Sequence, residues 1–205
     1  MQQGQDRLEK WKTLIRYQTG LLALTCGIAA MLLISMEGIT RPVIHQRVAE
    51  DQHVLLNEVL AGKTYANDVL AHPQFITYQG QTYQMFAVKN VQGEIIAHVV
   101  QGVVAGYGGP IQYLMGVDLD GVIQGVRIIS HSETPGLGDK IELAKSQWIL
   151  SFNHRSLTNT PLWAVKKDGG DFDQFSGATI TPRSVVKGVH DAMLALTQAL
   201  ASVEK

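Results

Sequence analysis

The sequence predicts an α+β protein in which a single N-terminal transmembrane helix is followed by a mostly antiparallel sheet packed with helices. Two observations carry this prediction. An uncharged and mostly apolar run covers residues 17–36, and short strand-like segments joined by turn-prone residues follow it. The length of 205 residues allows one anchor and one domain of ordinary size. A formal net charge of -1 supplies no basic field, so the chain is not expected to bind nucleic acid.

The apolar run has the length that a helix needs to cross a membrane, about 20 residues. It is too long for a cleaved signal peptide, and it continues well past Cys26, which disfavours a lipoprotein signal. The basic residues before it are Arg7, Lys10, Lys12 and Arg16, whereas only Arg41 and Arg47 follow it closely. The positive-inside rule therefore predicts a single-pass protein with residues 1–16 in the cytoplasm and everything after Met36 outside it.

Residues 37–75 are predicted as a helical connector that includes an amphipathic helix over 43–60. The sheet is predicted beyond it, and its strands are expected at 83–89, 94–104, 111–119 and 122–130. The intervening segments 90–93 and 118–121 are short and turn-prone, which favours antiparallel pairing.

Helical character is predicted again over 141–152, followed by a short strand at 162–165 and a turn at 166–170. A last helix is predicted near the C-terminus, with Thr181 as its N-cap and Pro182 as its first residue. Its apolar positions recur at helical spacing: Val185, Val186, Val189, Met193, Leu196 and Leu200.

The residue types that hold inorganic redox centres are scarce in the exported part. Cys26 is the only cysteine and lies inside the anchor, so cysteine ligation of an iron–sulfur cluster is excluded there. The seven histidines show no close pairing of the zinc-site type, and we predict neither a metal site nor a catalytic constellation. Redox chemistry in this domain would have to come from an organic cofactor.

One short run, residues 173–179, places a lone hydroxyl on a small-residue turn before the last helix. The hydroxyl belongs to Thr179, and Gly177 and Ala178 keep the approach to it open. A phosphate on Thr179 would lie near a helix N-terminus, where free N–H groups and the helix dipole favour an anion. Arg183 in the first turn is a candidate for a charge-assisted contact with that phosphate.

Two glycine-rich loops precede this run. Residues 106–110 lie between strands and lack the strand-loop-helix context of a dinucleotide-binding turn, so a dinucleotide fold is not supported. Residues 132–138 place two glycines and a proline around Leu137, a composition suited to contact with a flat aromatic ring. The loop 132–138 can also be interpreted as an ordinary rigid turn between a strand and a helix.

The run from Asp173 to Thr179 resembles the flavinylation motif, in which a flavin transferase moves the FMN half of FAD to the final Thr. Together with the anchor and the loop 132–138, it makes the chain resemble the G subunits of Rnf ion-translocating electron-transport complexes. These are similar to the C subunit of the sodium-translocating NADH:quinone reductase. The resemblance implies a phosphoester of FMN on Thr179 and recognition of Asp173 by the transferase. The further cofactor contacts that it implies are Ser176, Gly177, Ala178, Arg183, Glu133, Thr134, Pro135, Gly136, Leu137 and Gly138.

The resemblance also implies what the protein does. Residues 76–205 would be an FMN-binding domain on the periplasmic side of a bacterial inner membrane. This domain would pass electrons between other membrane subunits of a complex that couples electron transfer to ion translocation. The expected partners are those subunits, the flavin transferase and membrane lipid. A membrane-tethered, non-redox ligand- or protein-binding module is the alternative. The coupling ion, the direction of electron flow and the immediate donor and acceptor stay open.

Overall fold

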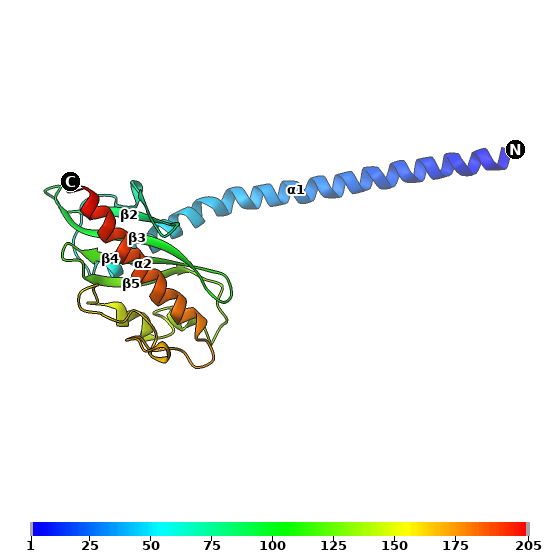
Figure 1. Ribbon diagram of the computed structural model, residues 1–205. Coiled ribbons are helices and arrows are strands. Elements are labelled where there is room, and N and C mark those ends of the chain that lie inside the picture. Colours follow the sequence, from blue (N-terminus) through cyan, green and yellow to red (C-terminus); the bar gives the residue numbers. More distant parts are fainter. Residues whose placement is uncertain (1, 204–205) are drawn as a thin grey trace. The chain divides into compact units, whose positions relative to one another are not determined.

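The computed structural model describes residues 2–203, with the side chains of 15–38, 40 and 53–202. Two compact units divide the chain after Gln52. Helix α1 (Gln2–Val59) makes up the described part of the first unit, and its last residues belong to the second (Figure 1). The predicted anchor and the predicted helix over 43–60 are therefore parts of one continuous helix. The side chains of 41–52 lie outside the described residues.

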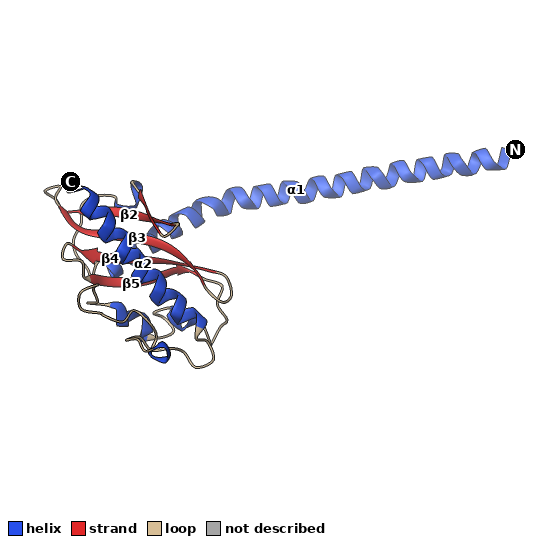
Figure 2. Ribbon diagram, in the orientation of Figure 1, coloured by secondary structure: helices blue, strands red, loops and turns tan. Residues whose placement is uncertain are grey.

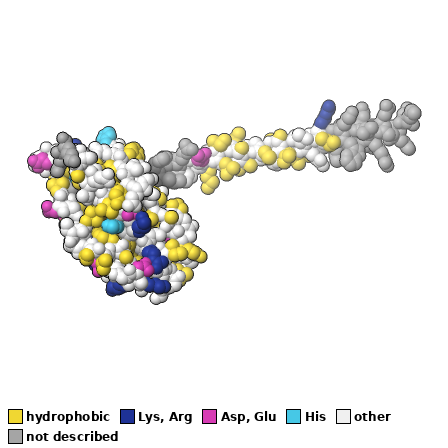
Figure 3. All heavy atoms as spheres, in the orientation of Figure 1, with side chains coloured by type: hydrophobic (Ala, Val, Ile, Leu, Met, Phe, Trp, Pro, Cys, Tyr) yellow, Lys and Arg dark blue, Asp and Glu magenta, His cyan; other side chains and the backbone are white. Residues whose placement is uncertain are grey.

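Helix α1 contains the segment Ile15–Gly38, whose mean hydropathy of 2.0 and length of 24 residues suffice to cross a membrane. Its side chains are exposed, and Figure 3 shows hydrophobic side chains along this part of the helix. The hydroxyls of Thr19, Thr25 and Ser35 donate to backbone carbonyls three or four residues earlier. These hydroxyls therefore need no water, as is required in hydrocarbon.

The second unit contains a five-stranded antiparallel sheet with the order β1-β2-β3-β4-β5 (Figure 2). The strands are β1 (Gln74–Tyr78), β2 (Gln81–Lys89), β3 (Ile95–Ala105), β4 (Pro110–Asp118) and β5 (Ile123–Ser130). The α+β class and the four predicted strands are confirmed, the strands to within two residues at each end.

Strand β1 was not predicted from the sequence. It pairs with β2 through a two-residue turn, Gln79-Gly80, in which both residues have positive φ (48° and 79°). This is the geometry of a type I′ hairpin, for which Asn-Gly or Asp-Gly is the usual sequence. Because Gln stands at the first position, the local sequence does not indicate this turn.

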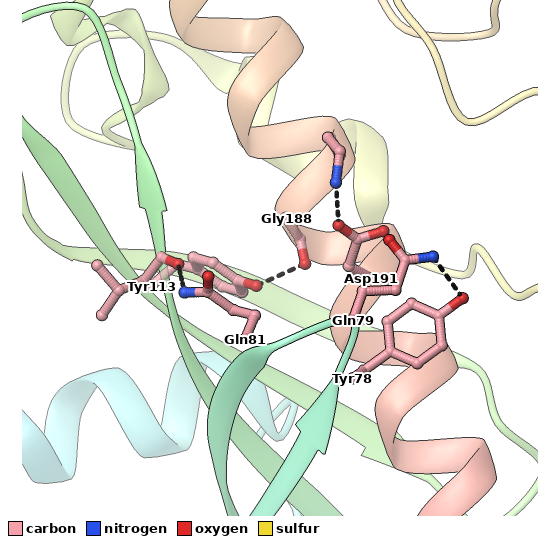
Figure 4. Close-up of polar contacts among 8 residues, drawn as sticks. Tyr78, Gln79, Gln81, Tyr113, Gly188 and Asp191 are labelled. Carbon is pink, nitrogen blue, oxygen red and sulfur yellow. Dashed lines mark hydrogen bonds and ion pairs between the residues drawn. The ribbon is translucent and has the colours of Figure 1, made fainter.

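The two faces of the sheet carry separate cores. Helix α2 (Ile180–Val203) packs across one face, where Val185, Val189 and Met193 are buried (Figure 1). The end of α1 and the short helix η1 (Val69–Ala71) cover the other face. The phenol of Tyr113 on β4 donates to the carbonyl of Gly188 in α2 at 2.6 Å, and burial raises the pKa of this phenol (Figure 4). This bond links α2 to the sheet.

One predicted element is confirmed in part and another is wrong. The helical character predicted over 141–152 is found as 3-10 helix at η3 (Gln147–Phe152) and at the end of η2 (Asp139–Ile141), whereas residues 142–146 form turns. Ser146 caps η3 by accepting from the N–H of Trp148. Residues 162–165 form no strand. Val165 makes one isolated bridge to Phe172, and this closes a loop around the 3-10 helix η4 (Lys166–Asp168).

Candidate functional site

A cavity of about 320 Å³ opens where three segments of the second unit meet. These segments are the β3–β4 loop, the loop after β5 and the N-terminal end of α2. We call residues 132–138 the cavity loop and residues 173–179 the attachment segment. The lining residues are Tyr107, Glu133, Thr134, Leu137, Gly138, Gly177, Ala178, Thr179, Ile180 and Thr181. The volume is typical of a small-molecule site, at the lower end of the range of about 300–1,000 Å³.

Thr179 occupies the N-cap position of α2. Its carbonyl accepts from the N–H of Arg183 at 3.3 Å, which is the first bond of the helix. Its side chain is half-buried, and its hydroxyl makes no hydrogen bond to any of the residues whose side chains the structure describes. The N–H groups that follow it in the first turn have no partner in the helix. The hydroxyl thus stands at a cavity wall where backbone donors and the helix dipole favour a phosphate.

The prediction that Thr181 caps α2 is wrong, because the helix begins at Ile180 and includes Thr181. The hydroxyl of Thr181 is turned inward and donates to Glu133 Oε2. The cap therefore lies two residues earlier than the capping pattern indicates. The partner of Thr181 lies 48 positions away, so no local pattern reveals this bond.

The cavity loop is held from within by Glu133. Its side chain is buried at 6% exposure, and Oε1 accepts from the N–H of Gly108 at 3.0 Å. Its other oxygen accepts from Thr181, and its own N–H donates to His131 Nδ1 at 3.0 Å. One side chain therefore ties together all three segments that wall the cavity.

Apolar side chains stand at the cavity. Tyr107, Leu137 and Ile180 line it and are 71%, 44% and 48% exposed, respectively. Such side chains suit contact with a flat aromatic ring. The sequence indicated Leu137 but missed Tyr107 and Ile180. Tyr107 belongs to the loop 106–110, which is not a dinucleotide-binding turn. It lines the cavity through a tertiary contact that the local sequence does not indicate.

The attachment segment is anchored at Phe175 and exposed elsewhere. Phe175 is buried and packs edge-on against Trp148, with ring centroids 5.1 Å apart. A bridge between Phe175 and Ala178 closes a tight turn whose tip, Ser176 and Gly177, is exposed. The side chain of Asp173 is 70% exposed and pairs with Lys166 Nζ at 2.7 Å. Only the backbone carbonyl of Asp173 contacts the core, where it accepts from Trp148 Nε1 at 2.7 Å.

Several residues expected at the site are placed differently. Ser176, Pro135 and Gly136 do not line the cavity. The guanidinium of Arg183 binds both carboxylate oxygens of Asp168, at 2.5 and 2.7 Å, and this hydrogen bonding lowers the pKa of Asp168. The contact between Arg183 and a phosphate on Thr179 stays a prediction. It requires the ion pair between Arg183 and Asp168 to open.

A larger and shallower hollow of about 720 Å³ lies along β5. Its polar side chains already pair with one another, Arg127 with Glu58 at 2.6 Å and His131 with Glu142 at 2.5 Å. We assign the site to the smaller cavity, because it, unlike the hollow along β5, combines a hydroxyl without a partner among the described residues, a helix N-terminus and exposed apolar side chains.

The class of the domain follows from its match to a known protein family. Residues 106–194 match the model of the FMN-binding domain family, and this range contains both glycine-rich loops, the attachment segment and most of α2. The chain therefore contains an FMN-binding domain. The cavity fits this cofactor: an unpartnered hydroxyl and free N–H groups lie at one wall, and Tyr107, Leu137 and Ile180 supply apolar surface for a ring.

Curated relatives then identify the family. The chain is 42% identical to the G subunit of the ion-translocating oxidoreductase complex of Stutzerimonas stutzeri, over 91% of this chain and 82% of that protein. It is 38% identical to the G subunit from Salmonella typhi, over 89% of this chain and 87% of that protein. Among solved structures, Shewanella oneidensis NqrC is 25% identical, with a TM-score of 0.43 over 57% of this chain and 62% of that one. The chain belongs to the family of G subunits of ion-translocating oxidoreductase complexes.

Proposed function

We propose that the chain is a membrane-anchored flavoprotein subunit that carries one FMN as a phosphoester on Thr179. In this role it relays electrons within an ion-translocating oxidoreductase complex. The observation that carries the proposal is the unpartnered Thr179 hydroxyl at the wall of the cavity and at the N-cap of a 24-residue helix. The FMN-binding domain and the names of the relatives support a redox role and favour it over a non-redox binding module.

Attachment requires little from this chain beyond the hydroxyl. The Thr179 oxygen forms a bond to the phosphorus of the FMN half of FAD. The bond from that phosphorus to the bridging oxygen breaks, AMP leaves with this oxygen, and the hydroxyl proton passes to a base. A flavin transferase supplies that base, and the exposed carboxylate of Asp173 is available for its recognition. Bound FMN supplies two-electron uptake and one-electron release. Attachment through the phosphate leaves the ring unmodified and prevents loss of the cofactor.

Replacing Thr179 by Val tests the attachment directly. The change keeps the size of the side chain but removes the oxygen, so covalent flavin is lost while the domain still folds. Flavin fluorescence of the protein band on a denaturing gel reports the outcome. Ser184→Ala is the matched control, because it removes a hydroxyl of the same helix that lies outside the motif and does not line the cavity, and it is expected to keep the fluorescence. A fluorescent band in the Thr179→Val variant contradicts the proposal.

We further propose that residues 1–16 are cytoplasmic, that 17–36 span the bacterial inner membrane, and that 37–75 connect this span to an FMN-binding domain at 76–205. The basic residues before the span support this orientation, and the helix Ile15–Gly38 contacts membrane lipid. A reporter that works only outside the cytoplasm should be active after Lys205, and a cytoplasmic reporter there should be silent. The reverse pattern contradicts the orientation.

A further inference from the structure

Glu133 is a buried carboxylate whose hydrogen-bonding capacity is directed at the protein. Gly108 N–H donates to one oxygen and the Thr181 hydroxyl to the other, so both oxygens act as acceptors, as in an ionised carboxylate. Among the ion pairs of the described residues, none involves Glu133. This side chain, 6% exposed, is thus held by neutral partners alone.

The surrounding backbone is shaped around this carboxylate. A Cβ on Gly106 would lie 2.2 Å from Glu133 Oε1, and one on Gly138 would lie 2.7 Å from Oε2. Glycine at both positions allows the β3–β4 loop and the cavity loop to close on the carboxylate. The donors come from separate segments, one from the β3–β4 loop and one from α2. The carboxylate therefore acts as a clamp between these elements.

A clamp of this kind does not need a charge. Burying an ionised group without a cation is costly, and neutral or apolar groups of similar size hold segments together at least as well. An acidic residue nevertheless stands at the wall of the cavity, where Glu133 is one of the lining residues. Its side chain is 6% exposed, so little water screens a charge on it from whatever fills the cavity.

We propose that Glu133 is a positioning and tuning residue for the flavin: it clamps the cavity walls, and its charge lowers the midpoint potential of the bound cofactor. Reduction adds electron density to the ring, and a fixed negative charge at the cavity wall opposes that addition. This role does not require a direct polar contact with the flavin, because each oxygen already accepts a hydrogen bond from the protein. The inference rests on the proposed function, since it requires FMN in this cavity.

Glu133→Gln in the full-length, flavin-loaded protein tests the charge. The amide keeps the size of the side chain and removes the charge, so the midpoint potential from a spectroscopic redox titration should become more positive than that of the wild type. Glu94→Gln is the matched control. It removes one charge at the opposite end of β3, about 30 Å away at about 3.3 Å per residue, and should leave the potential unchanged. A loaded Glu133→Gln variant with the wild-type potential overturns the inference.

Thr181→Val provides the second arm. This variant keeps the charge but removes the hydroxyl that disperses it, so the midpoint potential should fall below that of the wild type. If Glu133→Gln fails to fold or load, this arm decides alone, and an unchanged or raised potential overturns the inference.

The clamp is tested without cofactor. Flavin-free Glu133→Ala, which removes both acceptors, and flavin-free Thr181→Val should both melt at a lower temperature than the flavin-free wild type, and unchanged melting temperatures contradict the clamp. A wild-type chain that carries no flavin in its native membrane contradicts the proposed function instead, and so the two failures are distinguishable.

Discussion

The cavity loop and the attachment segment meet at one cavity but are stabilised in opposite ways. The cavity loop is held by a buried carboxylate that receives hydrogen bonds from two other segments. The attachment segment is held by one buried ring, Phe175, and by an exposed ion pair between Asp173 and Lys166. The first arrangement shapes a space before any cofactor arrives. The second leaves the Asp173 carboxylate exposed, as the proposed recognition by a transferase requires. The proposed positioning and the proposed attachment of the cofactor thus fall on different parts of the chain.

The largest effect that separates the two regions is expected for Asp173→Ala. The side chain is exposed and its ion pair is a surface pair, so the free energy of unfolding should change by no more than about 0.5 kcal/mol. Flavin stoichiometry should nevertheless fall sharply, because the variant lacks the group that we propose the transferase recognises. Both quantities are measured on one preparation, by absorbance after denaturation and by thermal melting.

Lys166→Ala is the control for that experiment. It removes the same ion pair but keeps the Asp173 carboxylate, and it should load normally. Full loading of Asp173→Ala combined with slow electron transfer would place Asp173 in the working site and break the division between the two regions. Failure of Asp173→Ala to fold would show that the segment is a structural turn.

Substituting one glycine next to the cavity loop and one in the attachment segment should lower the free energy of unfolding by different amounts. A Cβ on Gly108, which donates to the clamp, would lie 1.9 Å from the carbonyl oxygen of Ser132, so Gly108→Ala must move backbone and should cost about 2–4 kcal/mol. A Cβ on Gly177 meets nothing closer than 3.7 Å, and only its φ of +81° opposes a side chain. Gly177→Ala should therefore cost about 1–2 kcal/mol. Denaturant unfolding of the flavin-free variants measures both values, and equal costs would contradict the difference in packing.

The smallest expected effect is on the pH dependence of stability, through a histidine in the sheet that precedes the cavity loop. His98 on β3 is buried, its Nδ1 has no partner among the described residues, and burial lowers its pKa. As the pH falls below the ordinary histidine pKa of about 6.5, the unfolded chain takes up a proton before the folded chain does. Stability should decrease from there down to the folded-state pKa.

The variant His98→Gln should flatten this part of the pH dependence of the melting temperature, whereas His72→Gln, at an exposed position, should not. The same slope in the wild type and in His98→Gln would show that another group is responsible.

The sequence predicts the parts of this molecule whose signals are local. The anchor is a composition signal, and β2 to β5 alternate or run apolar between turn residues. Strand β1 was not predicted because its turn contains Gln79 in place of the usual Asn or Asp. The helical segment expected over 141–152 is interrupted before Ser146, whose hydroxyl caps η3. The attachment segment could be singled out because it is a contiguous motif.

The rest of the site depends on contacts between distant segments. Tyr107 joins the cavity wall only because β3 and β4 bring their loop next to Glu133, and Thr181 faces inward only because Glu133 receives its hydroxyl. Nothing in the residues near Arg183 reveals that Asp168, 15 positions earlier, holds its guanidinium. Such pairings are set by the fold and not by spacing along the chain.

Peptide mapping of the protein from its native membrane tests the central claim most directly. Proteolysis followed by mass spectrometry with fragmentation should find one FMN, joined through its phosphate to Thr179, in the peptide that contains the attachment segment. Flavin on Ser176 or Thr181, or a chain that releases all its flavin on denaturation, would contradict the account.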